Sequence, residues 1–247
     1  MDVIAIIPSR YESTRFPGKP LAEILGKPMI QWVYERATKA GNVSCVYVAT
    51  DDRRIYDAVV KFGGNAAMTS TENRSGTDRV AEAAEKLGIK MNDIIVNIQG
   101  DQPLFNPFSI DQLVKPFFIE PDLSMSTLAF KIVDKNEITS PKDVKVTFNQ
   151  RGDALYFSRS PIPYGRDPQL DFNTYKHLGF YAYTRRFLKS FSSLPEGNLE
   201  AIEKLEQLRA IEYGYRIRVI ITEYDSPEVD LPEDISRIEK LVGESFL

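Results

Sequence analysis

The chain has 247 residues, with 31 lysines and arginines against 35 aspartates and glutamates, which gives a formal net charge of −4. Hydrophobic residues make up 43%, enough for a folded core and too many for a disordered chain. The negative charge gives no support for binding to a nucleic acid backbone. A single cysteine, Cys45, and a single histidine, His177, exclude internal disulfides and metal sites built from several cysteines or histidines.

The first ten residues, MDVIAIIPSR, lack the basic start and long apolar run of a signal peptide. No apolar stretch reaches the roughly 18 residues of a membrane span. We therefore expect no membrane segment and a cytoplasmic location, which also fits the low cysteine count.

Short apolar runs alternate with amphipathic stretches in the first half of the chain. Val3–Ile7 is rich in β-branched residues without polar alternation, which is typical of a parallel strand covered on both faces. Further strands are predicted over 45–49, 65–68 and 93–98, and helices over 28–40, 52–62 and 77–87, with Asp51 as the N-cap of the second helix. This alternation predicts a parallel sheet with right-handed crossovers.

The pattern changes after about residue 121, where polar, proline-rich connections separate short strands. Strands predicted over 124–131, 144–148, 154–158 and 177–183 indicate a smaller lobe on a mixed or antiparallel sheet. A helix over 199–213, a strand over 216–222 and a helix over 232–241 follow, and the last two are expected to rejoin the first sheet. The predicted organisation is an α/β core of residues 1–120 with 205–247, and a lobe of residues 121–204.

The loop after the first predicted strand, residues 8–20, carries three cations. Ligands bind at the carboxyl ends of strands in open parallel sheets, so Arg10, Arg15 and Lys19 suit a polyphosphate there. The alternative is a solvated basic loop. The loop is neither a Walker A motif nor a dinucleotide fingerprint, because the glycine, lysine and hydroxyl spacings of those motifs are missing.

Two aspartates follow other predicted strands. Asp101 comes after the fourth strand and directly after Gly100, so it could approach a ligand closely and offer oxygens to Mg²⁺. Asp230 follows the last strand. The alternatives are a turn aspartate bonded to backbone for Asp101 and a helix cap for Asp230, although Asp234 has the more cap-like position.

Polar residues also precede the third predicted helix and occur in the second lobe. Ser75 and Thr77 could bind a base or a phosphate, or cap the helix. Arg159, His177 and several tyrosines lie in the lobe, although a lone histidine is more often structural than a ligand. No nucleophile elbow is present, so hydrolase triads are disfavoured.

Seven segments, in this order, resemble the 3-deoxy-manno-octulosonate cytidylyltransferases, and the resemblance covers essentially the whole chain: IIPSRYESTRFPGKPL, RSGTDRVAEA, IVNIQGDQP, ALYFSRSPIP, YKHLGFYAY, EKLEQLRAIEYG and VDLPEDI. The resemblance implies a nucleotidyltransferase-type three-layer sandwich with a mostly parallel sheet, and a smaller mixed-sheet lobe that binds sugar and forms a homodimer. It also implies Mg²⁺, CTP and an eight-carbon acidic sugar destined for lipopolysaccharide.

The same resemblance implies roles for individual residues. Arg15, Lys19, Asp101 and Asp230 would be catalytic, and the two aspartates would bind the metal. The nucleotide would contact Pro8, Ser9, Arg10, Lys19, Ser75, Gly76, Thr77 and Gln99, and the sugar would contact Gln99, Arg159, His177, Tyr181, Glu206 and Gln207.

Departures from the family pattern leave the sugar open. Leu231 stands where threonine is usual, and Tyr164-Gly165 stands where Trp-Asp is common. The alternatives are 3-deoxy-manno-octulosonate, its 8-amino-3,8-dideoxy analogue and a nine-carbon acidic sugar. A non-catalytic nucleotide-binding regulatory module is the alternative from another functional class.

Overall fold

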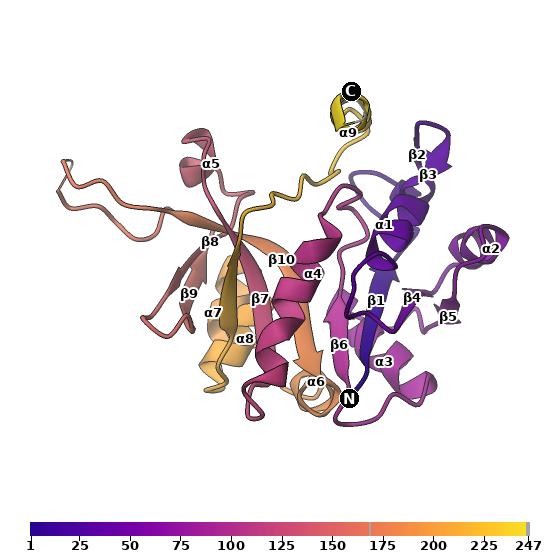
Figure 1. Ribbon diagram of the computed structural model, residues 1–247, viewed down its shortest axis with the longest axis horizontal. Coiled ribbons are helices and arrows are strands. Elements are labelled where there is room, and N and C mark those ends of the chain that lie inside the picture. The colour runs from indigo at the N-terminus through magenta and orange to yellow at the C-terminus, as the bar shows by residue number, and fades with distance from the viewer. Residues whose placement is uncertain (168, 246–247) are drawn as a thin grey trace.

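The computed structural model describes residues 1–167 and 169–245, and within them nine strands form one sheet through the middle of the molecule (Figure 1). Seven strands run in the order β11-β7-β10-β6-β1-β4-β5, and β8 and β9 extend the sheet from β10. The strands are β1 (Val3–Ser9), β4 (Cys45–Thr50), β5 (Ala66–Met68), β6 (Ile94–Asn97), β7 (Met125–Lys131), β8 (Lys145–Phe148), β9 (Ala154–Ser158), β10 (Tyr175–Thr184) and β11 (Arg218–Thr222).

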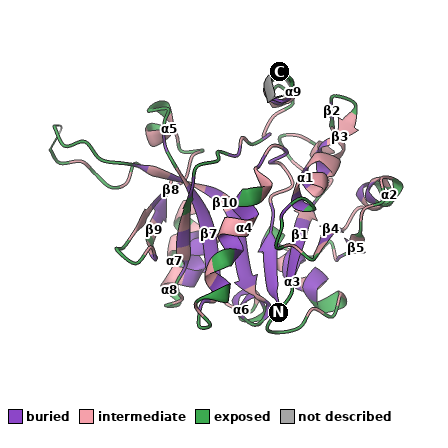
Figure 2. Cartoon of the chain, in the orientation of Figure 1, coloured by how far each residue is buried: buried purple, intermediate pink, exposed green. Residues whose placement is uncertain are grey.

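Helices cover both faces of this sheet, which confirms the predicted three layers. Along β1, Ala5 and Ile7 pack into the cluster with α1 and α4, while Ile4 and Ile6 pack into the cluster with α3, α6 and α8. Figure 2 shows the strands of the sheet as the most continuously buried part of the chain. The helices are α1 (Met29–Ala37), α2 (Arg53–Lys61), α3 (Gly76–Lys86), α4 (Pro107–Val114), α5 (Asn136–Thr139), α6 (Arg185–Ser192), α7 (Asn198–Glu203), α8 (Gln207–Glu212) and α9 (Asp234–Ser245), with the 3-10 turns Lys19–Leu21 and Lys115–Phe118.

The parallel half of the sheet matches the prediction, because β1 pairs in parallel with β4 and β6, and β4 with β5. The later strands are placed differently. β7 and β10 join this same sheet, with β10 antiparallel to both β6 and β7, and β11 pairs in parallel with β7. One continuous sheet therefore runs through both predicted units, and the division at residues 121 and 205 stays a prediction.

The prediction that the last helix rejoins the first sheet is wrong, because α9 packs in a separate apolar cluster. Strands β2 (Glu23–Ile24) and β3 (Lys27–Pro28) form a small hairpin that is separate from the main sheet. Helix α9 packs against β2 of this hairpin. Ile24, Val229 and Ile238 form the centre of this separate apolar cluster.

Two local predictions are wrong. The N-cap of α2 is Asp52, whose Oδ1 accepts from the Arg54 amide at 2.8 Å, because Asp51 instead pairs with the fully buried Arg79 at 2.6 Å. The helix predicted over 199–213 is divided into α7 and α8, because Lys204 adopts a left-handed conformation (φ 53°) that ends α7.

Candidate active site

A cavity of about 250 Å³ lies at the carboxyl ends of β1 and β6, where the sequence predicts a phosphate site. The end of β1 and the loop after β6 approach so closely that a Cβ on Gly100 would lie 3.1 Å from Ser9 Oγ. The Ser9 hydroxyl is buried and has no hydrogen-bond partner among the described residues, so it is available to a ligand. We call this the phosphate-side cavity; its lining includes Pro8, Ser9, Arg10, Arg15, Lys19, Gln99 and Asp101.

Lys19 links this loop to the two predicted metal-binding aspartates. Its Nζ lies 2.7 Å from Asp101 Oδ2 and donates to the carbonyl of Val229 at 3.0 Å. The Val229 amide in turn donates to the Asp101 carbonyl at 2.9 Å, and Arg15 pairs with Asp230 at 3.0 Å. Two aspartates 129 positions apart in the sequence (230 minus 101) are thus brought to one place, each beside a cation.

Glu228 is a further acidic group at this place that the sequence analysis did not select. Enclosure by the surrounding protein, followed by the negative charges of Asp101 and Asp230, raises the pKa of its carboxyl to about 7. Gln102 Nε2 donates to it at 2.9 Å. The only signal for Glu228 in the sequence was its position two residues before Asp230. Acidic residues are common in segments that follow a strand, so this position did not distinguish it.

The carboxylates fit one kind of metal binding and not another. No group of three or more His, Cys, Asp and Glu within the described ranges is arranged to hold an ion by itself. Mg²⁺ commonly takes one or two protein carboxylates and completes its shell with water and substrate phosphates. Asp101 and Asp230 therefore suit Mg²⁺ shared with a triphosphate, and a closed structural metal centre does not fit.

All six predicted sugar-binding residues line a second cavity, of about 390 Å³, which we call the sugar-side cavity. It shares Arg15, Gln99 and Asp101 with the phosphate-side cavity, so the two adjoin at the aspartates. Lys142 and Lys204 also line it, and neither gave a sequence signal. The six residues are Gln99, Arg159, His177, Tyr181, Glu206 and Gln207.

Arg159 and Gln99 are fixed by backbone atoms. Arg159 donates from Nε to Glu203 O at 2.8 Å and from Nη1 to Pro141 O at 2.9 Å. Because its charge is held by carbonyls and not by a carboxylate in these bonds, it can attract an acidic ligand. Gln99 Nε2 donates to the carbonyl of Gly179 at 2.9 Å, which leaves the Gln99 amide oxygen as an acceptor.

The tautomer of His177 follows from its neighbour Thr127. The Thr127 hydroxyl donates its one proton to Phe180 O at 2.7 Å, so its contact with His177 Nε2 at 2.8 Å requires the imidazole to donate. Nδ1 is then an acceptor. The ring also packs against Phe157 and Tyr181, and this burial lowers the pKa of the imidazole to about 3.

We expect His177 to stay neutral throughout the physiological pH range. As the only histidine, it gives one unambiguous imidazole signal in ¹⁵N NMR, which should show the Nε2–H tautomer without titration from pH 5.5 to 8. Because its pKa is lower in the folded than in the unfolded chain, its contribution to the free energy of unfolding is complete above about pH 6.5 and declines as the pH falls towards 3. His177→Asn should remove that part of the acid dependence, and an imidazole titrating near pH 6.5 in the folded protein would contradict the assignment.

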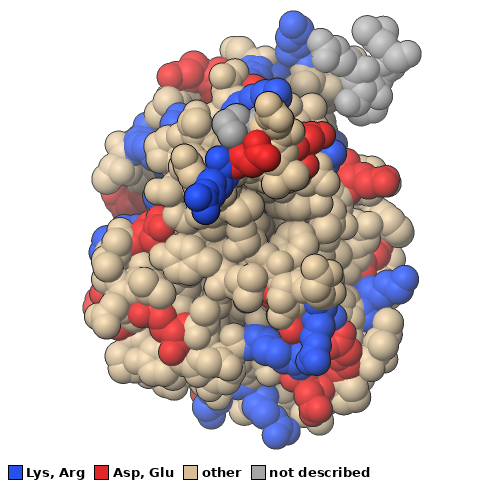
Figure 3. Space-filling view, turned by 90° about the vertical axis from the view of Figure 1, so that its left-hand side faces the viewer, with Lys and Arg blue, Asp and Glu red and all other residues tan. Residues whose placement is uncertain are grey.

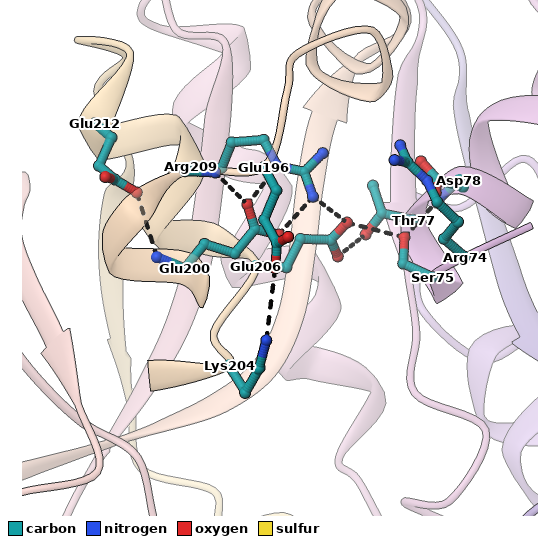
Figure 4. Close-up of polar contacts among 11 residues, drawn as sticks. Arg74, Ser75, Thr77, Asp78, Glu196, Glu200, Lys204, Glu206, Arg209 and Glu212 are labelled. Atoms are coloured by element: carbon teal, nitrogen blue, oxygen red, sulfur yellow. Dashed lines mark hydrogen bonds and ion pairs between the residues drawn. The ribbon is translucent and has the colours of Figure 1, made fainter. Parts of the chain in front are cut away.

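The Ser75–Thr77 turn contacts residues of both the phosphate-side cavity and the sugar-side cavity. Ser75 is the N-cap of α3, as one of the two sequence interpretations had it, because its Oγ accepts from the Asp78 amide at 3.1 Å. An added Cβ on Gly76 would lie 3.4 Å from Pro8, which places the turn beside the phosphate-side cavity. The hydroxyls of Ser75 and Thr77 both point to Glu206, at 2.9 and 2.7 Å (Figure 4).

Comparison with known proteins identifies the family of this chain. The cytidylyltransferase family model matches residues 4–218. The chain belongs to the cytidylyltransferase family. The 3-deoxy-manno-octulosonate cytidylyltransferase of Desulfosudis oleivorans is 62% identical over 243 residues, covering 98% of each chain. The 8-amino-3,8-dideoxy-manno-octulosonate cytidylyltransferase of Shewanella amazonensis is 57% identical over 240 residues, covering 97% of this chain and 98% of the relative.

A solved structure extends the agreement to the fold of this cytidylyltransferase. CMP:2-keto-3-deoxy-manno-octonic acid synthetase, solved in complex with CTP, superposes with a TM-score of 0.93 at 43% identity, covering 99% of this chain and all of the other. The family resemblance drawn from the seven sequence segments is thereby confirmed. No helix in the described part of the chain is long and apolar enough to cross a membrane.

Proposed function

We propose that the protein transfers CMP from CTP to the anomeric hydroxyl of 3-deoxy-manno-octulosonate and releases pyrophosphate, for lipopolysaccharide biosynthesis. The observation that carries this proposal is the junction of the two cavities at Asp101, where a nucleotide phosphate and an acidic sugar can meet. The names of the relatives and the CTP-bound neighbour support it.

The residues of the two cavities divide the work. Arg10 and Lys19 would neutralise the β- and γ-phosphates, which leave as pyrophosphate when the sugar hydroxyl attacks the α-phosphorus in line. Arg159 would bind the sugar carboxylate, and Nδ1 of His177 would accept a bond from a sugar hydroxyl. These contacts hold the reactants in line, so most of the rate enhancement comes from positioning and charge neutralisation.

We further propose that Asp101 and Asp230 hold Mg²⁺ together with substrate oxygens. The bound ion would neutralise charge on the reacting phosphate and lower the pKa of the attacking hydroxyl. The exposed Arg15 can leave Asp230 at little cost, because surface ion pairs contribute only about 0–1 kcal/mol.

The 8-amino sugar is a second candidate substrate, favoured by one feature of the structure. A further cavity of about 220 Å³ shares Lys142, His177, Glu228 and Asp230 with the sugar-side cavity, and six acidic residues against three basic ones line it. A terminal ammonium group would find negative charge there. The six acidic residues are Glu137, Asp143, Asp225, Glu228, Asp230 and Asp234.

One assay decides among the substrates. CTP and Mg²⁺ are incubated with 3-deoxy-manno-octulosonate, its 8-amino analogue or a nine-carbon acidic sugar, and pyrophosphate is measured. We expect the highest kcat/KM with 3-deoxy-manno-octulosonate. A higher value with the amino sugar would favour the second candidate, and CTP binding without pyrophosphate release from any sugar would indicate a regulatory module.

We also propose a cytoplasmic homodimer formed through residues 121–204. Support for a dimer comes from large apolar side chains exposed in that segment, including Leu155, Tyr164 and Leu170. Figure 3 shows a broad uncharged area on the face turned to the viewer, with basic and acidic groups interspersed around it. Light scattering at micromolar concentration tests the dimer, and a monomeric mass would overturn it.

A further inference from the structure

Both oxygens of the Glu206 carboxylate are held by hydroxyls from another part of the chain. Ser75 Oγ donates to Oε1 at 2.9 Å, and Thr77 Oγ1 donates to Oε2 at 2.7 Å, across 131 and 129 positions of sequence. Figure 4 shows the carboxylate of Glu206 lying between this turn and the side chain of Arg209. The carboxylate is therefore fixed in position and in rotation about its own axis.

The nearest cation does not compete for this carboxylate. Arg209 Nε donates to Glu200 Oε2 at 2.7 Å, whereas its Nη2 lies 3.7 Å from Glu206 Oε1. The main ion pair of Arg209 is thus with Glu200. The two hydroxyls supply the short bonds to Glu206, and each carboxylate oxygen keeps a lone pair for a further donor.

The backbone around Glu206 is built to bring it to the turn. Lys204, in the left-handed conformation, ends α7, and the buried Leu205 anchors the short connection to α8. Glu206 lies directly before α8 and lines the sugar-side cavity. Thr77 itself is buried, and its Oγ1 also accepts from Asn97 Nδ2 at 3.5 Å, so its hydroxyl is directed away from the solvent.

We propose that Ser75 and Thr77 are positioning residues for the sugar, which act by holding the Glu206 carboxylate in the orientation that binds sugar hydroxyls. This proposal rests on the proposed function, and it differs from the sequence prediction that both residues contact the nucleotide. Their side-chain hydroxyls serve the sugar, while the backbone of the same turn remains beside the phosphate-side cavity.

Thr77→Val removes the hydroxyl and keeps the shape of the side chain. Loss of one hydrogen bond to a charged group should raise the KM for the acidic sugar about tenfold or more. The KM for CTP should change less than about twofold, since the hydroxyl would not contact the nucleotide. Thr77→Ser should restore the sugar KM, and Thr38→Val, an exposed threonine lining neither cavity, is the matched control.

A double-mutant cycle separates action through Glu206 from independent contact with substrate. On a Glu206→Gln background, Thr77→Val should add little to the sugar KM. Additive effects, or a rise confined to the KM for CTP, would overturn the proposal. Calorimetric titration of the sugar, together with the pyrophosphate assay on CTP and Mg²⁺, distinguishes the two levels of inference. Sugar binding without release of pyrophosphate from CTP refutes the proposed function, while an unchanged sugar Kd in Thr77→Val refutes the positioning role.

Discussion

Replacing Asp230 with asparagine is expected to lower kcat about a hundredfold or more while the protein stays folded. The carboxylate is one of two proposed to hold Mg²⁺, and removing one such charged contact raises a barrier by on the order of 3 kcal/mol. Asparagine keeps the size of the side chain and the backbone amide that donates to Asp234 Oδ2 at 2.9 Å. The loss should therefore appear in turnover and in Mg²⁺ binding measured by calorimetry, with little change in the melting temperature.

Glu233→Gln provides the matched control. This exposed carboxylate lies three residues further along the same segment and lines neither the phosphate-side nor the sugar-side cavity. Its removal makes the same change in net charge, so an equal loss of turnover would point to a general electrostatic effect. Near-parental turnover and Mg²⁺ affinity in Asp230→Asn would remove Asp230 from the proposed metal site.

The parallel part of the fold could be predicted because its signals are local. Buried parallel strands such as β1 and β6 read as uninterrupted apolar runs, and the helices between them carry apolar periodicity. Strand order has no comparable local signal. Whether β7 and β10 form a separate sheet or join β6 depends on long-range pairing, which the residues of each strand do not specify by themselves.

Helices α4 and α6 were not predicted from the sequence, for two different reasons. α4 begins after Asn106, whose side chain caps the Phe108 amide at 2.9 Å, with Pro107 in its first turn, so a start signal was present in the sequence. α6 follows β10 without a loop, and its cap, Thr184, is also the last residue of the strand. Threonine is β-branched, which favours a strand, and its hydroxyl also favours an N-cap. The sequence around Thr184 therefore does not show where β10 ends and α6 begins.

For the candidate site, residue types could be selected from the sequence but their mutual contacts could not. Ends of strands and the family resemblance were enough to select Asp101, Asp230 and the sugar-side residues. They could not show that Ser75 and Thr77 bond to Glu206, because that contact depends on the left-handed turn at Lys204. Such a turn at a lysine leaves no signal in composition or periodicity.

Lys19→Ala is expected to lower kcat/KM for CTP by about a hundredfold. The Lys19 side chain is only 16% exposed and lines the phosphate-side cavity. Its ammonium is proposed to neutralise the leaving pyrophosphate, a charge contact of on the order of 3 kcal/mol. It also lies 2.7 Å from Asp101, so its removal leaves that carboxylate without its present cation. Steady-state kinetics with CTP varied at saturating sugar measure the effect.

Lys27→Ala is the control for the loss of a paired lysine, because Lys27 binds Glu35 at 2.6 Å and lies over the Trp32 ring, away from both cavities. We expect it to keep CTP kinetics within about twofold of the parent, since ion pairs of this exposure contribute little. Lys19→Arg keeps the charge and should recover part of the activity, although the bulkier guanidinium differs from an ammonium in its contacts. If Lys19→Ala instead left CTP kinetics unchanged and raised only the sugar KM, the ammonium would belong to the sugar-side cavity and the assignment of the first loop to the phosphates would be wrong.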